Sequence, residues 1–246
     1  MVVLHHKLDM CSWYNFNTTK VTMILYEPFP RSAITQGFSE NATETYKKNG
    51  LIGHTTLDYG GKCGDSIYNC ARGFCYSVMN KDNANLDKYR AVFILVEDGE
   101  FVYELSYGHL DKIYAVPGTW YGVGDVIGTL GNTGEVYMNG KRVTNEIRAK
   151  VPCAGGHLHG VQVRKCRKVS KVNPKKKYLS DANGTYVWNG SYIEIVNYWN
   201  GLNGCVNPMD FYNGILASTV IQNMKLQVSL LTKVVSLLKM LRGVVK

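Results

Sequence analysis

The segment GGHLHGVQV, residues 155–163, places two histidines one residue apart in a short apolar run that is typical of a β-strand. Side chains at positions i and i+2 of a strand point to the same side, so His157 and His159 face together while Leu158 faces the core. Two imidazoles on one face suit a metal ion, a proton transfer, or one of each. This strand is therefore predicted to contribute functional side chains in addition to a core residue.

Length and composition favour a globular, β-rich protein. Of the 246 residues 45% are hydrophobic, which is enough to build a core. The 25 glycines and 17 tyrosines, with short apolar runs between turn signals, favour strands over helices. The formal net charge of +9 favours anionic partners such as nucleic acid, acidic cell-wall polymers or anionic lipid. Nucleic acid is not expected, because no basic patch interleaved with aromatic residues lies on a recognisable reader fold.

The N-terminus and the cysteines bear on the compartment. MVVLHHKLDMCSWYNF lacks a basic region followed by a sustained apolar stretch, so no secretory signal is predicted. Apolar runs of 18 residues are absent, so no segment is predicted to span a membrane. The seven cysteines form no CxxC pair, which argues against a four-cysteine zinc site. Most are expected to be buried thiols, and the pairing of any disulfide cannot be read from the sequence.

Local signals divide the chain into three regions. Residues 1–30 form a lead-in that ends at the two prolines of EPFPRS, and residues 31–214 form the domain. Within the domain, AVFILVED (91–98) followed by GEFVYELSYGHL predicts a hairpin that turns at Asp98-Gly99. Residues 164–177 contain eight Lys or Arg residues and are predicted to form a basic loop or a solvated strand. Binding of anionic cell-wall polymers or lipid and a merely solubilising role are equally weighted for this stretch.

Residues 215–246 are predicted to form an amphipathic C-terminal α-helix, because they contain no proline and carry an apolar heptad seam. The seam consists of Ile221, Met224, Val228, Leu231, Val235 and Leu238. Further apolar residues widen this face (Leu230, Val234, Leu237, Leu241), and a polar fringe is formed by Lys225, Lys233, Lys239 and Arg242. Three interpretations stay open: a helix docked on its own domain, an oligomerising helix, and a helix lying on a membrane. The oligomerising helix is preferred, since β-branched residues alternate with Leu or Met along the seam.

A second cluster precedes the two strand histidines. GHTTLDYG places His54 and Asp58 four residues apart, and SYGHLDKI places His109 at the end of a predicted strand. Imidazole nitrogen and carboxylate oxygen are ligands that Zn²⁺ takes, and three protein ligands leave one position for water, as in catalytic sites. Each motif alone is weak, because a lone histidine is more often structural. His109 in particular could simply cap a strand at a turn.

Taken in order, GHTTLDYG, YGHLDKIYAVPGTWYGVGDVIGTLGNTG and GGHLHG resemble the lysostaphin-like family of zinc endopeptidases, which cut peptide bonds in bacterial peptidoglycan. ITQGFSEN and VNPMDFY resemble the start and the end of that family's domain. The similarity covers roughly residues 31–213, with a stretch at 167–204 that looks inserted. The resemblance implies a mainly β fold: an antiparallel β-sheet groove with a metal at its floor, open at both ends to an extended peptide. Tyrosines and Trp120 near the second motif are candidates to line that groove.

The resemblance also assigns roles. It implies that one Zn²⁺ is bound by His54, Asp58 and His159, and that His109 and His157 are the non-ligand pair that moves protons and steadies the oxyanion. Two positions depart from the family pattern: Thr56 replaces a usual glycine, and Gly160 with Val161 follows HLH, which puts the support of His159 in question. With all five key residues present, an active endopeptidase is expected. The expected setting is a phage lysin or virion tail protein, or an enzyme of the extracellular cell wall; the alternative is a non-catalytic wall-binding or structural virion protein.

Overall fold

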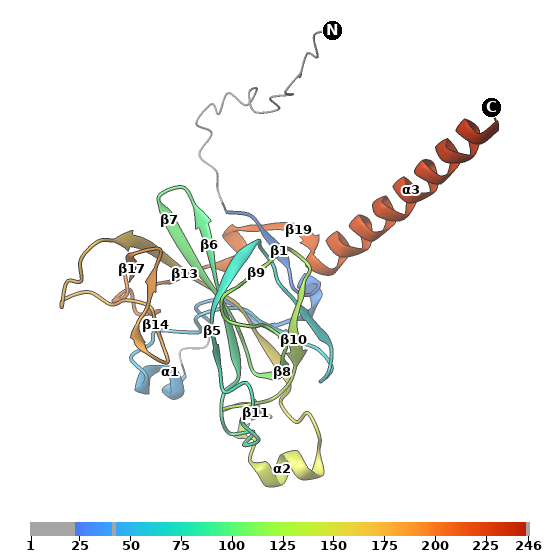
Figure 1. Ribbon diagram of the computed structural model, residues 1–246. Coiled ribbons are helices and arrows are strands. Elements are labelled where there is room, and N and C mark those ends of the chain that lie inside the picture. Colours follow the sequence, from blue (N-terminus) through green and yellow to red (C-terminus); the bar gives the residue numbers. More distant parts are fainter. Residues whose placement is uncertain (1–22, 41–42, 245–246) are drawn as a thin grey trace.

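The computed structural model describes residues 23–40 and 43–244 (Figure 1). Cys11 and the segment in which no secretory signal is predicted fall outside these residues. The fold is mainly β, with antiparallel sheets and a C-terminal helix, as the sequence predicts. The helices are α1 (Glu44–Lys48), α2 (Asn145–Lys150) and α3 (Ala217–Val244), with 3-10 turns η1 (Arg31–Ala33) and η2 (Pro208–Asp210). The strands are β1 (Leu25–Glu27), β2 (Ile34–Gln36), β3 (Asp58–Gly60), β4 (Ser66–Tyr68), β5 (Gly73–Met79), β6 (Ala91–Asp98), β7 (Phe101–Gly108), β8 (Leu110–Ile113), β9 (Thr119–Tyr121), β10 (Val126–Leu130), β11 (Tyr137–Met138), β12 (Lys141–Arg142), β13 (His157–Val169), β14 (Ser180–Asp181), β15 (Gly184–Thr185), β16 (Val187–Trp188), β17 (Ser191–Ile195), β18 (Cys205–Val206) and β19 (Tyr212–Leu216).

The largest sheet is organised around β13. Its strands follow the order β16-β17-β13-β7-β6-β5-β9, and β3 and β18 also pair with β13. On one side β13 pairs with β7 from His159 to Arg167. On its other side it pairs in turn with β3, β18 and β17. The first residues of β13, which carry the two histidines, therefore lie beside β3, which carries Asp58.

The predicted hairpin at Asp98-Gly99 is confirmed. Asp98 pairs with Phe101, and Gly99 adopts a φ of +59°, the left-handed conformation that glycine accepts without strain. Strand β6 is buried on both faces, because Ile94 packs into the main core and Leu95 packs into a second apolar cluster. The second cluster includes Leu179, Trp188 and Ile193 from the stretch predicted to be inserted. That stretch therefore covers the face of the sheet that would otherwise be open, which explains why β6 reads as a continuous apolar run.

The packed domain and the predicted boundaries differ at both ends. Met23 and Leu25 belong to the main core, and β1 pairs in parallel with β19, so the core extends N-terminally of the predicted boundary at Arg31. Helix α3 begins at Ala217 instead of residue 215, because Leu216 still pairs with Glu27 of β1. Among the described residues, no helix combines the length and the apolar character needed to cross a bilayer.

The basic stretch 164–177 is only partly a loop, because β13 continues to Val169. Several of its cations have partners: Arg164 pairs with the buried Glu104, Arg167 with Glu194, and Lys168 with Glu97. The exposed lysines of the stretch that lie beyond the strand include Lys171, Lys175 and Lys176. The strand part of the stretch thus contacts carboxylates of the domain, and the loop carries further exposed lysines.

Candidate metal centre

The five residues singled out from the sequence line one cleft of about 700 Å³. They come from four segments: the loop before β3 (His54), β3 itself (Asp58), the turn between β7 and β8 (His109), and the start of β13 (His157, His159). Their side-chain ligand atoms form two overlapping groups, His54–Asp58–His159 and His109–His157–His159. Within each group all ligand atoms lie within 4.8 Å of one another. Segments more than a hundred residues apart in the chain thus converge on one point.

Strand pairing brings Asp58 and His159 together. They are Cα partners in the antiparallel ladder between β3 and β13, where directly opposite side chains are neighbours. Asp58 Oδ1 lies 3.0 Å from His159 Nδ1. The register also places Gly60 opposite His157, so no side chain of β3 crowds that imidazole. The two-residue spacing of His157 and His159 therefore forms a site with Asp58 only because β3 pairs with β13 in this register.

His54 enters from a loop that is fastened to the segment before α1. Its backbone N–H donates to Glu40 O at 3.0 Å, and its carbonyl accepts from Ser39 N–H at 2.7 Å. The ring Nδ1 lies 3.2 Å from Gly37 O, so Nδ1–H donates there and Nε2 is left with its lone pair. Nε2 points at the carboxylate, 3.2 Å from Asp58 Oδ1.

Three acceptor atoms consequently converge. His54 Nε2, His159 Nδ1 and Asp58 Oδ1 are separated by 3.2, 3.2 and 3.0 Å. Ligands held about 2.0–2.2 Å from a tetrahedral Zn²⁺ are roughly 3.3–3.6 Å apart, close to this triangle. A lone pair of a neutral His54 facing a carboxylate is unfavourable without a cation between them. The donor set and its spacing therefore fit one zinc ion.

The protonation state of the Asp58 carboxyl group suits a cation at this position. Burial alone would raise the pKa of Asp58, but the imidazoles of His159, His54 and His157 beside it together outweigh burial and hold that pKa below its usual range. Asp58 is thus negatively charged at neutral pH. A negative charge that is 7% exposed needs positive charge beside it, and a metal ion would supply that charge.

His157 and His109 lie next to this triangle, with their ring planes tilted by 58° and their ring centroids 4.5 Å apart. His157 Nδ1 lies 2.8 Å from Gly155 O, and His109 Nδ1 lies 2.6 Å from Thr133 O. Each Nδ1–H therefore donates to a carbonyl, and each Nε2 keeps a lone pair. His157 Nε2 is 3.5 Å from Asp58 Oδ2. Burial, together with the nearby His157 and His159, lowers the pKa of His109 well below its usual value, so His109 is neutral near pH 7.

Several residues of the cleft were not found by sequence reasoning. Tyr89 is half-buried and packs edge-on against His109 at 5.0 Å between ring centroids. Thr133 supplies the carbonyl that orients His109, and its hydroxyl donates to Leu110 O at 2.9 Å. Tyr46 of α1 lines the cleft near His54. Tyr46 and Tyr89 lie outside the quoted motifs, and Thr133 lies at the end of the second motif without any local sign of its role; only the fold brings the three close to the histidines.

The suggestion that Trp120 lines the groove is not supported. Trp120 is on β9, where it packs against Phe74 and Trp188 instead of the histidines. Strand β9 is the last strand of the sheet, four strands from β13. Proximity in sequence to the second motif therefore did not translate into proximity in space. The tyrosines that do line the cleft are Tyr46 and Tyr137.

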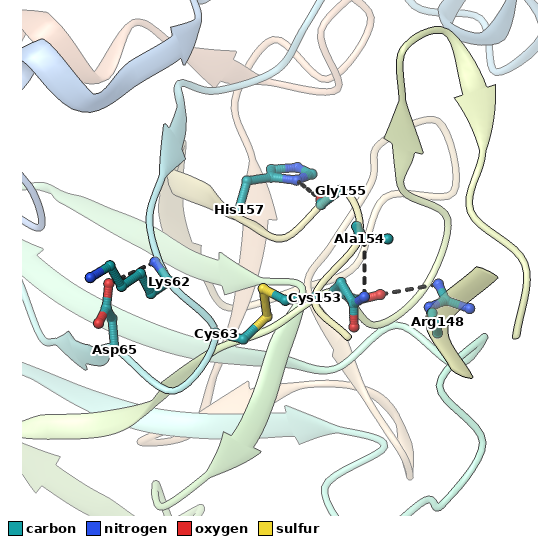
Figure 2. The surroundings of a disulfide bond; sticks show 9 residues. Lys62, Cys63, Asp65, Arg148, Cys153, Ala154, Gly155 and His157 are labelled. Carbon is teal, nitrogen blue, oxygen red and sulfur yellow. Dashed lines mark hydrogen bonds between the residues drawn. A yellow bond between two sulfur atoms is a disulfide. The ribbon is translucent and has the colours of Figure 1, made fainter. Parts of the chain in front are cut away.

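A disulfide joins Cys63 and Cys153 next to strands β3 and β13, which carry Asp58, His157 and His159 (Figure 2). Cys63 follows β3 and Cys153 precedes β13, so the bond links the loops that lead away from Asp58 and toward His157. It packs against Gly156, where an added Cβ would lie 2.4 Å from Cys153 Sγ. The other cysteines of the described chain are buried thiols, in line with the expectation from sequence (Cys70, Cys75, Cys166, Cys205).

The departure from the family pattern at Gly160 has a steric basis. Gly160 N–H donates to Leu57 O at 2.8 Å, and a Cβ at residue 160 would lie 1.9 Å from that oxygen. The loop that carries His54 therefore approaches β13 too closely for any side chain there. Thr56 is fully buried within the same loop. Gln162, two residues beyond Gly160, donates to Thr55 Oγ1 at 2.7 Å and provides a polar tie between loop and strand.

No protein-family model matches the sequence, and no curated protein matches it. Solved structures similar to this chain include the catalytic domain of the prophage-encoded M23 protein EnpA from Enterococcus faecalis (19% identity, 58% of this chain and 86% of that one, TM-score 0.36). A zinc-containing peptidase from Vibrio cholerae has 22% identity over 58% of this chain and a TM-score of 0.39, and the chain spans only 37% of it. LytU has 21% identity over 66% of this chain and 83% of its own, with a TM-score of 0.32.

Identities and TM-scores this low do not assign an activity, so the conclusion depends on the site itself. The described residues form a mainly antiparallel β fold, and one cleft of that fold gathers the five side chains that the resemblance to the lysostaphin-like family implies.

Proposed function

We propose that this chain is a zinc-dependent endopeptidase that hydrolyses peptide bonds in the stem or cross-bridge of bacterial peptidoglycan. The observation that carries the proposal is the triangle of acceptor atoms from His54, Asp58 and His159, with two further imidazoles beside it. The three residues would hold one ion, and a single carboxylate leaves that ion with net positive charge. Such a site suits catalysis better than a closed structural site, because only three protein ligands are present in this group.

A bound zinc ion supplies Lewis acidity, which polarises the scissile carbonyl and makes a coordinated water acidic near neutral pH. The chain's own contribution is the proton pathway. A neutral imidazole, His109 or His157, accepts the proton of the attacking water at Nε2. The resulting imidazolium steadies the oxyanion and then passes the proton to the leaving amine. The carbonyls of Thr133 and Gly155 keep both rings in the tautomer that this task requires.

The lining of the cleft supports a slender, extended substrate. Four lining residues are glycines, so a peptide backbone could approach the metal without meeting side chains (Gly60, Gly140, Gly155, Gly156). Tyr46 and Tyr137 provide apolar walls with polar ends. Flexible glycine-rich or D-amino-acid-containing peptides of the cell wall have this slender form.

The first test separates metal ligands from proton-transfer residues. Zinc per chain is measured by mass spectrometry of the metal, and peptidoglycan digestion by zymography and analysis of the released peptides. Asp58→Asn and His159→Ala should lose zinc and activity together. His109→Ala and His157→Ala should keep stoichiometric zinc yet lose activity by about a hundredfold or more. Asp82→Asn, which neutralises an exposed carboxylate outside the cleft, should change neither.

The alternative is a non-catalytic wall-binding or structural virion protein that keeps the same fold. Stoichiometric zinc without digestion of any peptidoglycan type would favour that alternative and overturn the endopeptidase. A His157→Ala variant as active as the parent chain would instead contradict the proton pathway while leaving the metal site intact.

We also propose that the protein is phage-encoded and acts in wall penetration or lysis, from the virion tail or at the cell wall. The exposed helix that follows the domain supports this setting, because it could connect a wall-cutting domain to another surface. Antibody labelling of purified particles in the electron microscope tests the tail location. The exposed loop lysines are the candidates for contact with anionic wall polymers, tested by co-sedimentation with teichoic acid (Lys171, Lys175, Lys176).

A further inference from the structure

Helix α3 leaves the domain and exposes its apolar side chains. Figure 1 shows it projecting away from the sheets. Contact with the body is confined to its beginning, where Ala217 is buried and Ile221 lies close to Gly124. From Met224 onward every apolar residue whose side chain is described is at least 43% exposed (Met224, Leu226, Val228, Leu230, Leu231, Val234, Val235, Leu237, Leu238). The helix is therefore not docked on its own domain, and an apolar surface of this extent indicates a partner.

The distribution of polar and apolar residues around the helix indicates what kind of surface it contacts. At about 100° per residue, the polar side chains from Val228 to Lys239 fall within one sector of roughly 120°. That sector contains Ser229, Thr232, Lys233, Ser236 and Lys239. The apolar side chains cover the opposite half of the circumference (Val228, Leu230, Leu231, Val234, Val235, Leu237, Leu238). The narrow polar stripe is compact, since the Thr232 and Ser236 hydroxyls donate to helix carbonyls at 2.9 and 3.0 Å.

The charges of the helix indicate the chemistry of the partner surface. Residues 217–244 contain no aspartate or glutamate, and the described charges of the helix are the exposed Lys225, Lys233 and Lys239. In projection, Lys233 and Lys239 lie at the two borders of the polar sector and Lys225 lies inside it. Lysines at such borders can extend their ammonium groups toward lipid headgroups while their stems cover apolar surface. The partner surface should therefore be anionic.

A second copy of the helix explains these features less well. A parallel coiled coil along Ile221, Met224, Val228, Leu231, Val235 and Leu238 would leave Leu230 and Leu237 outside the seam and still exposed. Lys225 and Lys239 would flank that seam with no acidic residue available to pair with them. We propose that α3 lies along an anionic lipid surface, with its wide apolar arc in the lipid and its lysines at the headgroups.

The test uses the full chain and vesicles of phosphatidylcholine with or without phosphatidylglycerol, scored by co-sedimentation and by circular dichroism. Binding should require the anionic lipid and weaken with salt. Replacing Lys225, Lys233 and Lys239 together by Gln should weaken binding about a hundredfold, about fivefold per lysine. Leu230→Ser with Leu237→Ser should also abolish binding, although neither residue belongs to the heptad seam. Ser229→Ala with Ser236→Ala, within the polar stripe, is the matched control and should bind as the parent chain does.

Two results would overturn the proposal. One is equal binding to neutral and anionic vesicles, or binding to neither. The other is a stable oligomer by analytical ultracentrifugation that persists in Leu230→Ser/Leu237→Ser but dissociates in Leu231→Ser/Leu238→Ser, which would assign the helix to a second copy of the chain. Zinc content and peptidoglycan digestion should be unchanged in all of these variants. The lipid proposal and the endopeptidase proposal therefore fail independently.

Discussion

At the scale of single residues, the chemistry available in the cleft depends on which ring nitrogen of each histidine donates a hydrogen bond to a backbone carbonyl. His54, His109 and His157 all direct Nδ1–H at a carbonyl oxygen and Nε2 into the cleft. His159 is reversed, with Nδ1 toward Asp58 and His54. Two residues apart on one strand, His157 and His159 therefore offer different nitrogens to the same space. This difference allows one to serve as a ligand and the other to handle protons.

Gly160 is predicted to be indispensable to this arrangement. In Gly160→Ala the new methyl group would lie 1.9 Å from Leu57 O, so the loop carrying His54 must move away from β13. We expect the free energy of unfolding to fall by about 2 kcal/mol or more, and zinc affinity to fall with it. Urea unfolding and zinc titration measure both. Gly122→Ala, whose added methyl would meet nothing closer than 3.4 Å, is the control and should be as stable as the parent chain.

Only some of the residues that form the cleft could be predicted from the sequence. His157 and His159 are predictable because a strand has a fixed two-residue period. His54 and Asp58 follow from their motif. Tyr89 and Thr133 are not predictable, because each lies in a loop and reaches His109 only after β6, β7 and β8 have paired. Their own neighbours in sequence contain no signal for that contact.

At the scale of elements, the predictable features are again the local ones. The hairpin at Asp98-Gly99 depends on two adjacent residues of turn chemistry, so it could be read directly. The pairing of one side of β13 with β3, β18 and β17 in turn could not be predicted, because no local sequence pattern specifies which distant strands pair. The pairing of Cys63 with Cys153 is a consequence of the same register. Once His157 lies opposite Gly60, the two cysteines beyond the strand ends face each other.

We predict that reducing the Cys63–Cys153 disulfide loosens the metal centre. The bond closes a separation of 90 residues, for which loop-closure entropy predicts a stabilisation of about 4.6 kcal/mol. Because it also holds the backbone just before His157, dithiothreitol should lower both the unfolding temperature and the rate of peptidoglycan digestion. The Cys63→Ser/Cys153→Ser variant should already show both losses and should not respond further to dithiothreitol. A response of the same size in that variant would contradict this role.

Thiol labelling of the native protein provides the accompanying check. Burial raises the pKa of Cys205 to about 11 and that of Cys75 to about 12, so both remain protonated and unreactive near pH 8. In a Cys11→Ser background, iodoacetamide should therefore label only Cys63 and Cys153, and only after reduction. Peptide mass spectrometry identifies the labelled sites. Labelling of Cys75 or Cys205 in the folded protein would show that the core opens on reduction.

At the scale of the whole molecule, the proposed ion would join parts of the chain that are otherwise held by separate interactions. The His54 loop is attached to residues before α1, β3 pairs with β2 and β13, and β13 runs through the centre of the main sheet. Binding at their meeting point stabilises the folded state, because the unfolded chain does not hold the three ligands together. The stability of the domain should consequently depend on zinc.

The predicted effect of metal removal follows from this linkage. At free zinc about a thousandfold above the dissociation constant, binding contributes about 4 kcal/mol, which corresponds to roughly 10 °C in unfolding temperature for a domain of this size. Chelation should lower the unfolding temperature by about that amount, and added zinc should restore it, as measured by scanning calorimetry. Asp58→Asn removes the one charged ligand, so its unfolding temperature should not respond to either treatment. If Asp58→Asn responded to zinc as strongly as the parent chain, the ion would have to bind elsewhere, and the triangle of His54, Asp58 and His159 would not be the metal site.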